Sequence, residues 1–212
     1  MSEVGSNKVD VGKSAQIISV LVGKEKQQWS IPMDLLCFHS GYFRSTLKGG
    51  FAEGKSKTVE LLNAKPEAFE LIVEWLYTHE IKTSGRDNPS DIYTEKPNIA
   101  TLLEAWMLAD YLQLRKLQNT IMKLMDERMT HYGEVPVEEF NRAYQDYTDP
   151  HLRAWILDAY VWAIPDDNEL VDYFDEQSDF ELLQDILRQM LRGVLTGAKE
   201  RFVLNEDHLV PE

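Results

Sequence analysis

A single β-hairpin, at the start of a chain that is otherwise patterned as helix, is the feature that most constrains the fold. Residues 16–22 (QIISVLV) are rich in β-branched side chains and predict a buried strand. A turn over 23–26 separates this strand from Trp29 and Ile31, which alternate with polar residues as in a half-buried strand. An isolated hairpin is marginally stable in water, so other elements must cover its apolar face.

The part of the chain that follows the hairpin predicts one more strand among several helices. Pro32 ends the hairpin because proline cannot donate to a strand ladder. Pro66 opens the strongest helix, in which apolar residues recur at every third or fourth position. Three short strands among helices predict a mixed α+β fold. The predicted elements are helices over 33–39 and 41–48, a strand over 57–62, and helices over 66–78, from 99 with Asn98 as its cap, and over 115–130.

The last part of the chain predicts three more helices and carries almost all of the net charge. Residues 132–212 hold 19 acidic and 6 basic side chains, which is −13 of the total of −14. Asp149 and Pro150 form a cap and a first residue for one of these helices, and Ser178 and Glu181 have the capping-box spacing for the last. We expect this tail to pack on the preceding domain with its acid outward. The inward face predicted for the last helix consists of Phe180, Leu183, Leu187, Met190 and Val194.

Composition argues against several classes of function. The one cysteine, Cys37, excludes an internal disulfide, and its apolar neighbours predict a buried thiol. No apolar stretch approaches the ~20 residues of a membrane span, and no signal-peptide pattern opens the chain. We therefore expect an intracellular protein of the cytoplasm, the nucleus or both, with no membrane partner. An acidic surface repels phosphate, so we expect no nucleic-acid partner either.

The residues that could support catalysis or bind a metal lack the necessary spacing. Cys37 and His39 are two positions apart, and side chains at that spacing do not face each other on a helix. The five histidines show no zinc-ligand spacing. We therefore predict a protein that is not an enzyme and that needs no cofactor or metal. An enzyme of unknown type is the most remote alternative.

Five segments carry a family resemblance. Residues 31–43 (IPMDLLCFHSGYF) contain a helix that leads into a Ser-x-Tyr-Phe signature, and 47–53 (LKGGFAE) connect it to the next strand. That strand, 58–61 (TVEL), precedes a central helix, 66–78 (PEAFELIVEWLYT), and a later helix end, 108–114 (LADYLQL). In this order they resemble the BTB domain, also called POZ.

The resemblance implies a domain organisation. The BTB/POZ fold, a small three-stranded sheet with helical hairpins, is expected over 16–131, followed by an α-helical C-terminal extension. Residues 152–162 of that extension resemble single-domain BTB proteins of filamentous fungi. The remaining expected segments are a disordered N-terminus over 1–15, a flexible polar loop over 83–97, the acidic helical extension over 132–204 and a C-terminal tail over 205–212.

Two departures from the family pattern matter. Many BTB domains have a histidine where this chain has Pro32. Many dimeric members also carry an N-terminal extension that helps to build a swapped interface, whereas no long helix is predicted before residue 16. The resemblance therefore does not imply that mode of dimerisation, and the chain is closer to the shorter Skp1-like and elongin-C-like forms.

Phe51, Ala52 and Glu53 are the predicted protein-interaction site. They match the hydrophobic-x-Glu motif of cullin-binding BTB adaptors, in which the apolar side chain docks on a cullin helix and the carboxylate fixes the loop or the partner. An exposed aromatic on a short glycine-flanked loop is an efficient anchor. In the other interpretation, Phe51 covers the local core and Glu53 is solvated.

The resemblance implies a protein–protein interaction adaptor, and two hypotheses follow. The first is a substrate-recruiting subunit of a cullin–RING ubiquitin ligase, with a cullin scaffold as its partner. The alternative is a BTB scaffold or transcription-related regulator that acts through self-association, without ubiquitin chemistry. A homo-oligomer and a hetero-oligomer are both compatible with the sequence.

Overall fold

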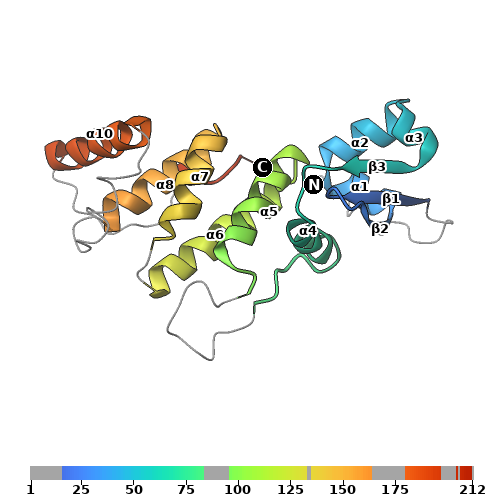
Figure 1. Cartoon of the computed structure of the whole chain (residues 1–212), viewed down its shortest axis with the longest axis horizontal. Coiled ribbons are helices and arrows are strands. Elements are labelled where there is room, and N and C mark those ends of the chain that lie inside the picture. Colours follow the sequence, from blue (N-terminus) through green and yellow to red (C-terminus); the bar gives the residue numbers. More distant parts are fainter. Residues whose placement is uncertain are drawn as a thin grey trace, which may run out of the picture. The chain divides into compact units, whose positions relative to one another are not determined.

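The chain folds into two compact units in the computed structural model (Figure 1). Unit 1 comprises Met1–His79 and Leu108–Leu114, and unit 2 comprises Glu80–Met107 and Arg115–Glu212. The predicted disordered segment 1–15 and most of the predicted loop 83–97 lie outside the described residues. The structure describes residues 16–83, 96–132, 135–163, 180–196, 204 and 206–211, and it describes 163, 193–196 and 207 by their backbone alone.

Unit 1 contains a three-stranded sheet that confirms the predicted strands. Strands β1 (Ile17–Val22) and β2 (Gln27–Pro32) form the predicted antiparallel hairpin. Strand β3 (Thr58–Leu61) pairs with β1 in the parallel sense, which gives the order β2-β1-β3. Parallel neighbours need a long crossover, and the helices between β2 and β3 provide it.

One face of this sheet forms the core of unit 1. Ile18, Val20 and Val22 are all buried, while the residues between them are more exposed, as the alternation of a one-sided sheet requires. Val20 is paired with Trp29, whose ring meets Phe69 edge-on with the centroids 5.2 Å apart. Phe69 belongs to the helix that Pro66 opens, so this helix covers the buried face.

The helices of unit 1 begin and end close to their predicted positions. Ser40 caps the second of them, because its hydroxyl oxygen accepts from the Phe43 amide at 3.0 Å. The same hydroxyl donates to the Leu112 carbonyl at 2.6 Å, which ties the helix to the 108–114 segment. Cys37 is buried as predicted. The helices are α1 (Met33–His39), α2 (Gly41–Lys48), α3 (Ala52–Ser56), α4 (Pro66–Thr78) and the end of α5 (Ile99–Tyr111).

The elements described in unit 2 are helices, and two predicted caps are confirmed there. The Asn98 side chain accepts from the Thr101 amide at 2.8 Å and starts α5. The Asp149 carboxylate accepts from the Leu152 amide at 3.0 Å at the start of α8. The elements that follow α5 are α6 (Arg115–Tyr132), α7 (Val137–Asp146), α8 (Pro150–Ala163), α10 (Phe180–Thr196) and the short 3-10 helix η1 (Glu206–His208).

Helices α7 and α8 pack on each other, and the end of α7 contacts α5, as predicted for the tail. Phe140 of α7 and Trp155 of α8 are fully buried, with ring centroids 5.1 Å apart. Tyr147, at the end of α7, meets the buried Trp106 of α5 edge-on at 6.0 Å. Residues on both sides of position 131 therefore share one core in unit 2. The overall fold is α+β with a helical C-terminal extension, as predicted.

The last described residues form a strap across α6 and α8. The Asn119 side chain donates to the Val210 carbonyl at 2.9 Å and accepts from the Val210 amide at 2.8 Å. The buried ring of His208 lies with Nε2 2.9 Å from Asp158 Oδ2 on α8. Asp158 is therefore an acidic residue of the tail whose side chain faces inward, whereas we predicted that the acidic side chains of the tail face outward.

The predicted inward face of α10 is wrong. Phe180 and Leu187 were expected inside, but 73% and 58% of their surface is exposed. Leu182 and Ile186 are buried instead, on the side that contacts α8. The apolar spacing was read correctly, but the helix is turned so that polar residues beside this stripe meet α7 and α8. The predicted cap Ser178 and the side chain of Val194 lie outside the described residues.

Candidate functional site

The predicted site lies at the turn between α2 and α3, in unit 1. Gly49 caps the C-terminus of α2, and Gly50 follows with φ +81°. That backbone conformation is strained for a residue with a side chain, and glycine adopts it freely. Phe51 then begins α3 as its N-cap, with extended φ and ψ of −69° and 170°. The two glycines thus redirect the chain so that Phe51 starts a new helix.

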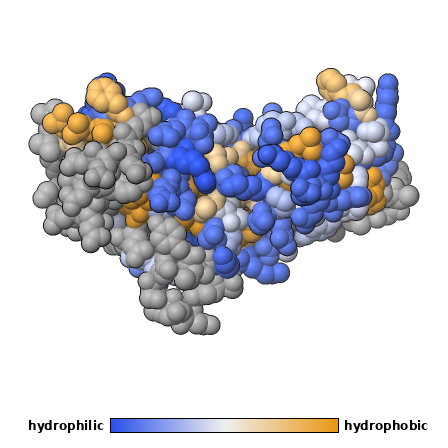
Figure 2. Space-filling model, in the orientation of Figure 1, coloured by the Kyte–Doolittle hydropathy of each residue, from blue (hydrophilic) through white to orange (hydrophobic). Residues whose placement is uncertain are grey.

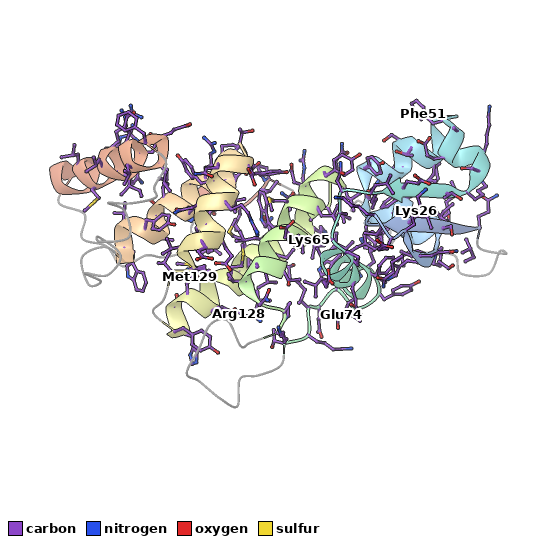
Figure 3. The ribbon with its side chains drawn as sticks, in the orientation of Figure 1. Lys26, Phe51, Lys65, Glu74, Arg128 and Met129 are labelled. Atoms are coloured by element: carbon purple, nitrogen blue, oxygen red, sulfur yellow. The ribbon has the colours of Figure 1, made fainter. Side chains whose placement is uncertain are left out.

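The side chain of Phe51 points outward, and its ring contacts Gly49. Its surface is 59% exposed, so it does not cover the local core. A Cβ on Gly49 would come within 2.8 Å of Phe51 Cε2, so the ring lies directly on that glycine. Figure 3 labels Phe51 beside the α2–α3 turn, where Figure 2 shows a hydrophobic patch. The ring is both accessible and held in place, as an anchor residue must be.

Ala52 and Glu53 form the first turn of a helix, where the sequence predicted a loop. The Glu53 carbonyl accepts from the Lys57 amide at 2.8 Å, which closes α3. Gly54 lets α3 approach α2 closely, because a Cβ there would lie 2.5 Å from the Leu47 carbonyl oxygen. Ala52 is exposed and Glu53 is half-buried. The motif is therefore presented by a backbone packed against α2.

Two tyrosines that the sequence did not assign to the site meet each other in unit 1. Tyr42 of α2 meets Tyr111 of α5 with ring centroids 5.0 Å apart, and Tyr111 is exposed. Burial and a hydrogen bond with Tyr111 raise the pKa of Tyr42 to about 12, and the negative charge of Glu53 acts in the same direction. We call Tyr42, Phe51, Glu53 and Tyr111 the α2–α3 surface. Tyr42 and Tyr111 both occur in quoted family segments, but nothing in the sequence showed that they meet.

Cys37 and His39, the pair considered for catalysis, each contact other groups. His39 contacts Trp75 and His79, with ring centroids 5.4 and 5.0 Å apart, and Cys37 lies 3.7 Å from the Phe43 carbonyl oxygen. Burial raises the pKa of the Cys37 thiol, which disfavours the nucleophilic thiolate. Within the described ranges, no three His, Cys, Asp or Glu side chains gather to hold a metal ion. None of the helices described combines the length and apolar character that a membrane crossing needs.

A family assignment follows from the comparison with known proteins. The model of the BTB/POZ domain family matches residues 19–128, which are 110 of the 212 residues of the chain. This chain belongs to the BTB/POZ family. BTB domains are protein-interaction modules, generally without enzymatic activity, and they mediate both protein–protein contacts and oligomerisation. The general role of the chain is therefore protein interaction, as the sequence predicted.

Solved BTB domains are among the structures that resemble this chain. The BTB domain of human gigaxonin is 14% identical, covers 50% of this chain and 75% of its own, and has a TM-score of 0.37. The BTB domain of zebrafish PATZ1 is 18% identical, covers 52% of this chain and 75% of its own, and has a TM-score of 0.38. None of the curated proteins matches the chain.

Proposed function

We propose that this BTB protein is a substrate-recruiting adaptor of a cullin–RING ubiquitin ligase, with Phe51 as its anchor on the cullin. The observation that carries the proposal is the 59% exposure of a phenylalanine at the hydrophobic position of a hydrophobic-x-Glu motif. Single exposed apolar residues are common on protein surfaces, so it is the position of Phe51 in this motif together with its exposure that supports the proposal.

Other side chains of unit 1 also suit a protein partner. Glu53 supplies a carboxylate two residues from Phe51, and Tyr111 offers a second exposed aromatic ring. Aromatic residues dominate the binding energy of interfaces, and truncating such an anchor costs about 2 kcal/mol or more. That cost corresponds to roughly a 30-fold loss of affinity. Because the backbone at Phe51 is already fixed by α2 and α3, little ordering is needed on binding.

The acidic extension is the part that would hold a substrate. Residues 132–212 carry a net charge of −13, whereas the preceding residues are nearly neutral. Complementary charge speeds association and selects partners, so this distribution favours a basic target. The BTB domain would bind the scaffold, and the extension would bind the protein to be ubiquitinated.

Affinity purification of the tagged full-length chain from its source cells tests the proposal. Cullin recovered with the chain is measured by quantitative mass spectrometry. Phe51→Ala combined with Glu53→Ala should reduce that recovery at least about tenfold. Phe38→Ala is the matched control, because Phe38 is a similarly exposed aromatic (51%) on α1 of the same unit, and it should leave recovery unchanged.

Unchanged cullin recovery from the Phe51 and Glu53 double variant would refute the assigned surface. If the unmodified chain recovers no cullin, the ligase role itself fails. A chain that recovers only itself would then favour the alternative, a scaffold that acts through self-association without ubiquitin chemistry. Thermal unfolding of each variant shows whether a loss of cullin reflects a lost contact or a lost fold.

A further inference from the structure

Helix α10 carries an apolar stripe on its solvent side. Phe180, Leu187 and Leu191 are 73%, 58% and 61% exposed, and Leu183 and Met190 beside them are half-buried. Figure 2 shows hydrophobic atoms gathered over α10. Single exposed apolar residues are common on protein surfaces, whereas a continuous stripe along a helix indicates a contact with another protein surface.

The stripe is distinct from the face that packs within unit 2. Leu182 and Ile186 are buried, and Gln189 donates to Asp158 Oδ1 on α8 at 2.7 Å. These contacts fix the rotation of α10 about its own axis. The exposed stripe follows the spacing of a helix-pairing seam, with Phe180 and Leu187 seven residues apart and Leu183 between them. Such a seam is completed by a second helix.

The charges of α10 are divided between its two halves. The N-terminal half carries Glu181, and the C-terminal half carries Arg188 and Arg192. Asp185, also in the N-terminal half, is turned toward Tyr144 of α7. Two parallel copies of this helix would place like charges side by side, which is unfavourable. Two antiparallel copies would place each acidic half beside a basic half. Glu181 pairs with Arg153 at 3.1 Å and Arg188 with Asp185 at 2.6 Å, yet the side chains of Glu181 and Arg188 are both 62% exposed, so an adjacent helix can share these charges.

We propose that α10 binds α10 of a second copy of this chain, in an antiparallel pair about a two-fold axis near Leu187. In that register, Leu187 meets Leu187 of the partner subunit, and Leu183 meets Leu191 of the partner subunit. Glu181 then lies within one residue of Arg192 of the partner subunit. A two-fold interface requires a self-complementary surface, and the divided charge of α10 meets that requirement.

This interface is separate from the family domain and from the α2–α3 surface. Helix α10 begins at Phe180, well beyond residue 128, where the BTB family match ends. Phe51 belongs to unit 1, whereas α10 belongs to unit 2. A contact between two copies of α10 requires that the helix be complementary to itself, whereas a contact with a different protein does not. The proposal therefore stands or falls independently of the cullin proposal.

The first experiment measures the mass of the full-length chain by light scattering over a range of concentrations. The unmodified chain should approach twice its mass of 24.6 kDa as the concentration rises. Leu187→Glu should return it to the single-chain mass. Phe51→Glu, a charge introduced at an equally exposed site in unit 1, should leave the dimer intact. Leu187→Glu should also unfold at the same temperature as the unmodified monomer, because this side chain is exposed.

A monomer at every concentration would overturn the proposal, because another occupant would then have to cover the stripe. A dimer that survives Leu187→Glu would overturn it as well, because the interface would lie elsewhere. If Leu187→Glu reduces self-association but Phe51→Glu does so equally, the effect is not specific to α10, and the proposal fails. Recovery of cullin by Leu187→Glu is measured in parallel and should not change.

The second experiment tests the antiparallel register by cysteine cross-linking in a Cys37→Ala background, which removes the one native thiol. Leu187→Cys should form a disulfide-linked dimer, because the two copies of this position meet on the axis. Phe180→Cys should not, because its two copies would lie about 21 Å apart along the helices. A mixture of Leu183→Cys and Leu191→Cys chains should cross-link with each other. Efficient cross-linking of Phe180→Cys with itself would show a parallel pair and overturn the proposed arrangement.

Discussion

Replacing Arg153 with alanine should destabilise unit 2, because this side chain joins α8 to the end of α7 and to α10. Arg153 Nε donates to the Tyr147 carbonyl at 2.9 Å, and Nη2 donates to the Tyr144 carbonyl at 2.8 Å. Both carbonyls lie at the C-terminal end of α7, where helix carbonyls lack partners within the helix. The guanidinium also lies 4.5 Å from the centre of the Tyr144 ring, and Nη1 pairs with Glu181 at 3.1 Å.

The expected cost follows from these contacts. Each hydrogen bond to a carbonyl that water can partly replace contributes about 1 kcal/mol. The contact with the Tyr144 ring adds about 0.5–1 kcal/mol. The ion pair adds about 0.5 kcal/mol at most, because the Glu181 side chain is 62% exposed. Arg153→Ala should therefore lower the free energy of unfolding by about 3 kcal/mol, which lowers the midpoint of thermal unfolding by roughly 6–12 °C in a chain of this size.

Urea and thermal unfolding of three variants would check this reasoning. Arg153→Ala should show the full loss, and Glu181→Gln should show about 0.5 kcal/mol or less. Arg142→Ala is the matched control, because Arg142 is an α7 arginine that pairs with Glu104 at 3.4 Å and is half exposed. It should cost less than about 1 kcal/mol. If Glu181→Gln costs as much as Arg153→Ala, the ion pair and not the helix end is the stabilising contact, and the reasoning is refuted.

Two further predictions concern contacts within unit 2. Asn119→Ala removes both hydrogen bonds to Val210, so amide exchange at residues 206–210 should quicken by about tenfold or more while the helices keep their protection. Equal exchange in the variant and the unmodified protein would show that these two bonds do not hold the last residues on α6. The Tyr144 hydroxyl donates to Asp185 at 2.6 Å, and this bond holds the pKa of that carboxyl below its usual value. Because the pKa of Asp185 is lower in the folded state than in the unfolded state, its ionised carboxyl stabilises the protein above about pH 4. This stabilisation is lost as the pH falls through the folded-state pKa. Tyr144→Phe should therefore flatten the fall in stability on acidification, and an unchanged slope would contradict this.

Local sequence signals were sufficient for most of the fold. The alternation in 27–32, the proline at 66 and the caps Asn98 and Asp149 act through neighbouring residues, so the strands and helices were found close to their observed ends. The parallel pairing of β3 with β1 joins distant segments, and no local pattern in the sequence encodes it. The family resemblance supplied the three-stranded sheet, but we did not predict this parallel pairing.

The candidate site was only partly predictable for the same reason. Phe51 and Glu53 are two residues apart, so a short motif identifies both. Tyr42 and Tyr111 come together because Ser40 bonds to the backbone just after α5. A contact between residues this far apart in the chain arises from tertiary packing. The sequence also predicted a loop where α3 forms, because a helix of five residues leaves almost no periodic signal.

The rotation of α10 shows what apolar spacing alone cannot decide. Burying Leu182 and Ile186 gains about as much as burying Leu183 and Leu187 would, roughly 1.5–3 kcal/mol for each side chain. The polar contacts decide between the two rotations of α10, because only the observed rotation brings Asp185 to Tyr144 and Gln189 to Asp158. Turning the helix the other way would leave partly buried groups on α7 and α8 without these partners, at about 1–3 kcal/mol each. The helix therefore keeps its polar contacts inside and leaves its pairing seam in water, where a second copy of the chain can cover it.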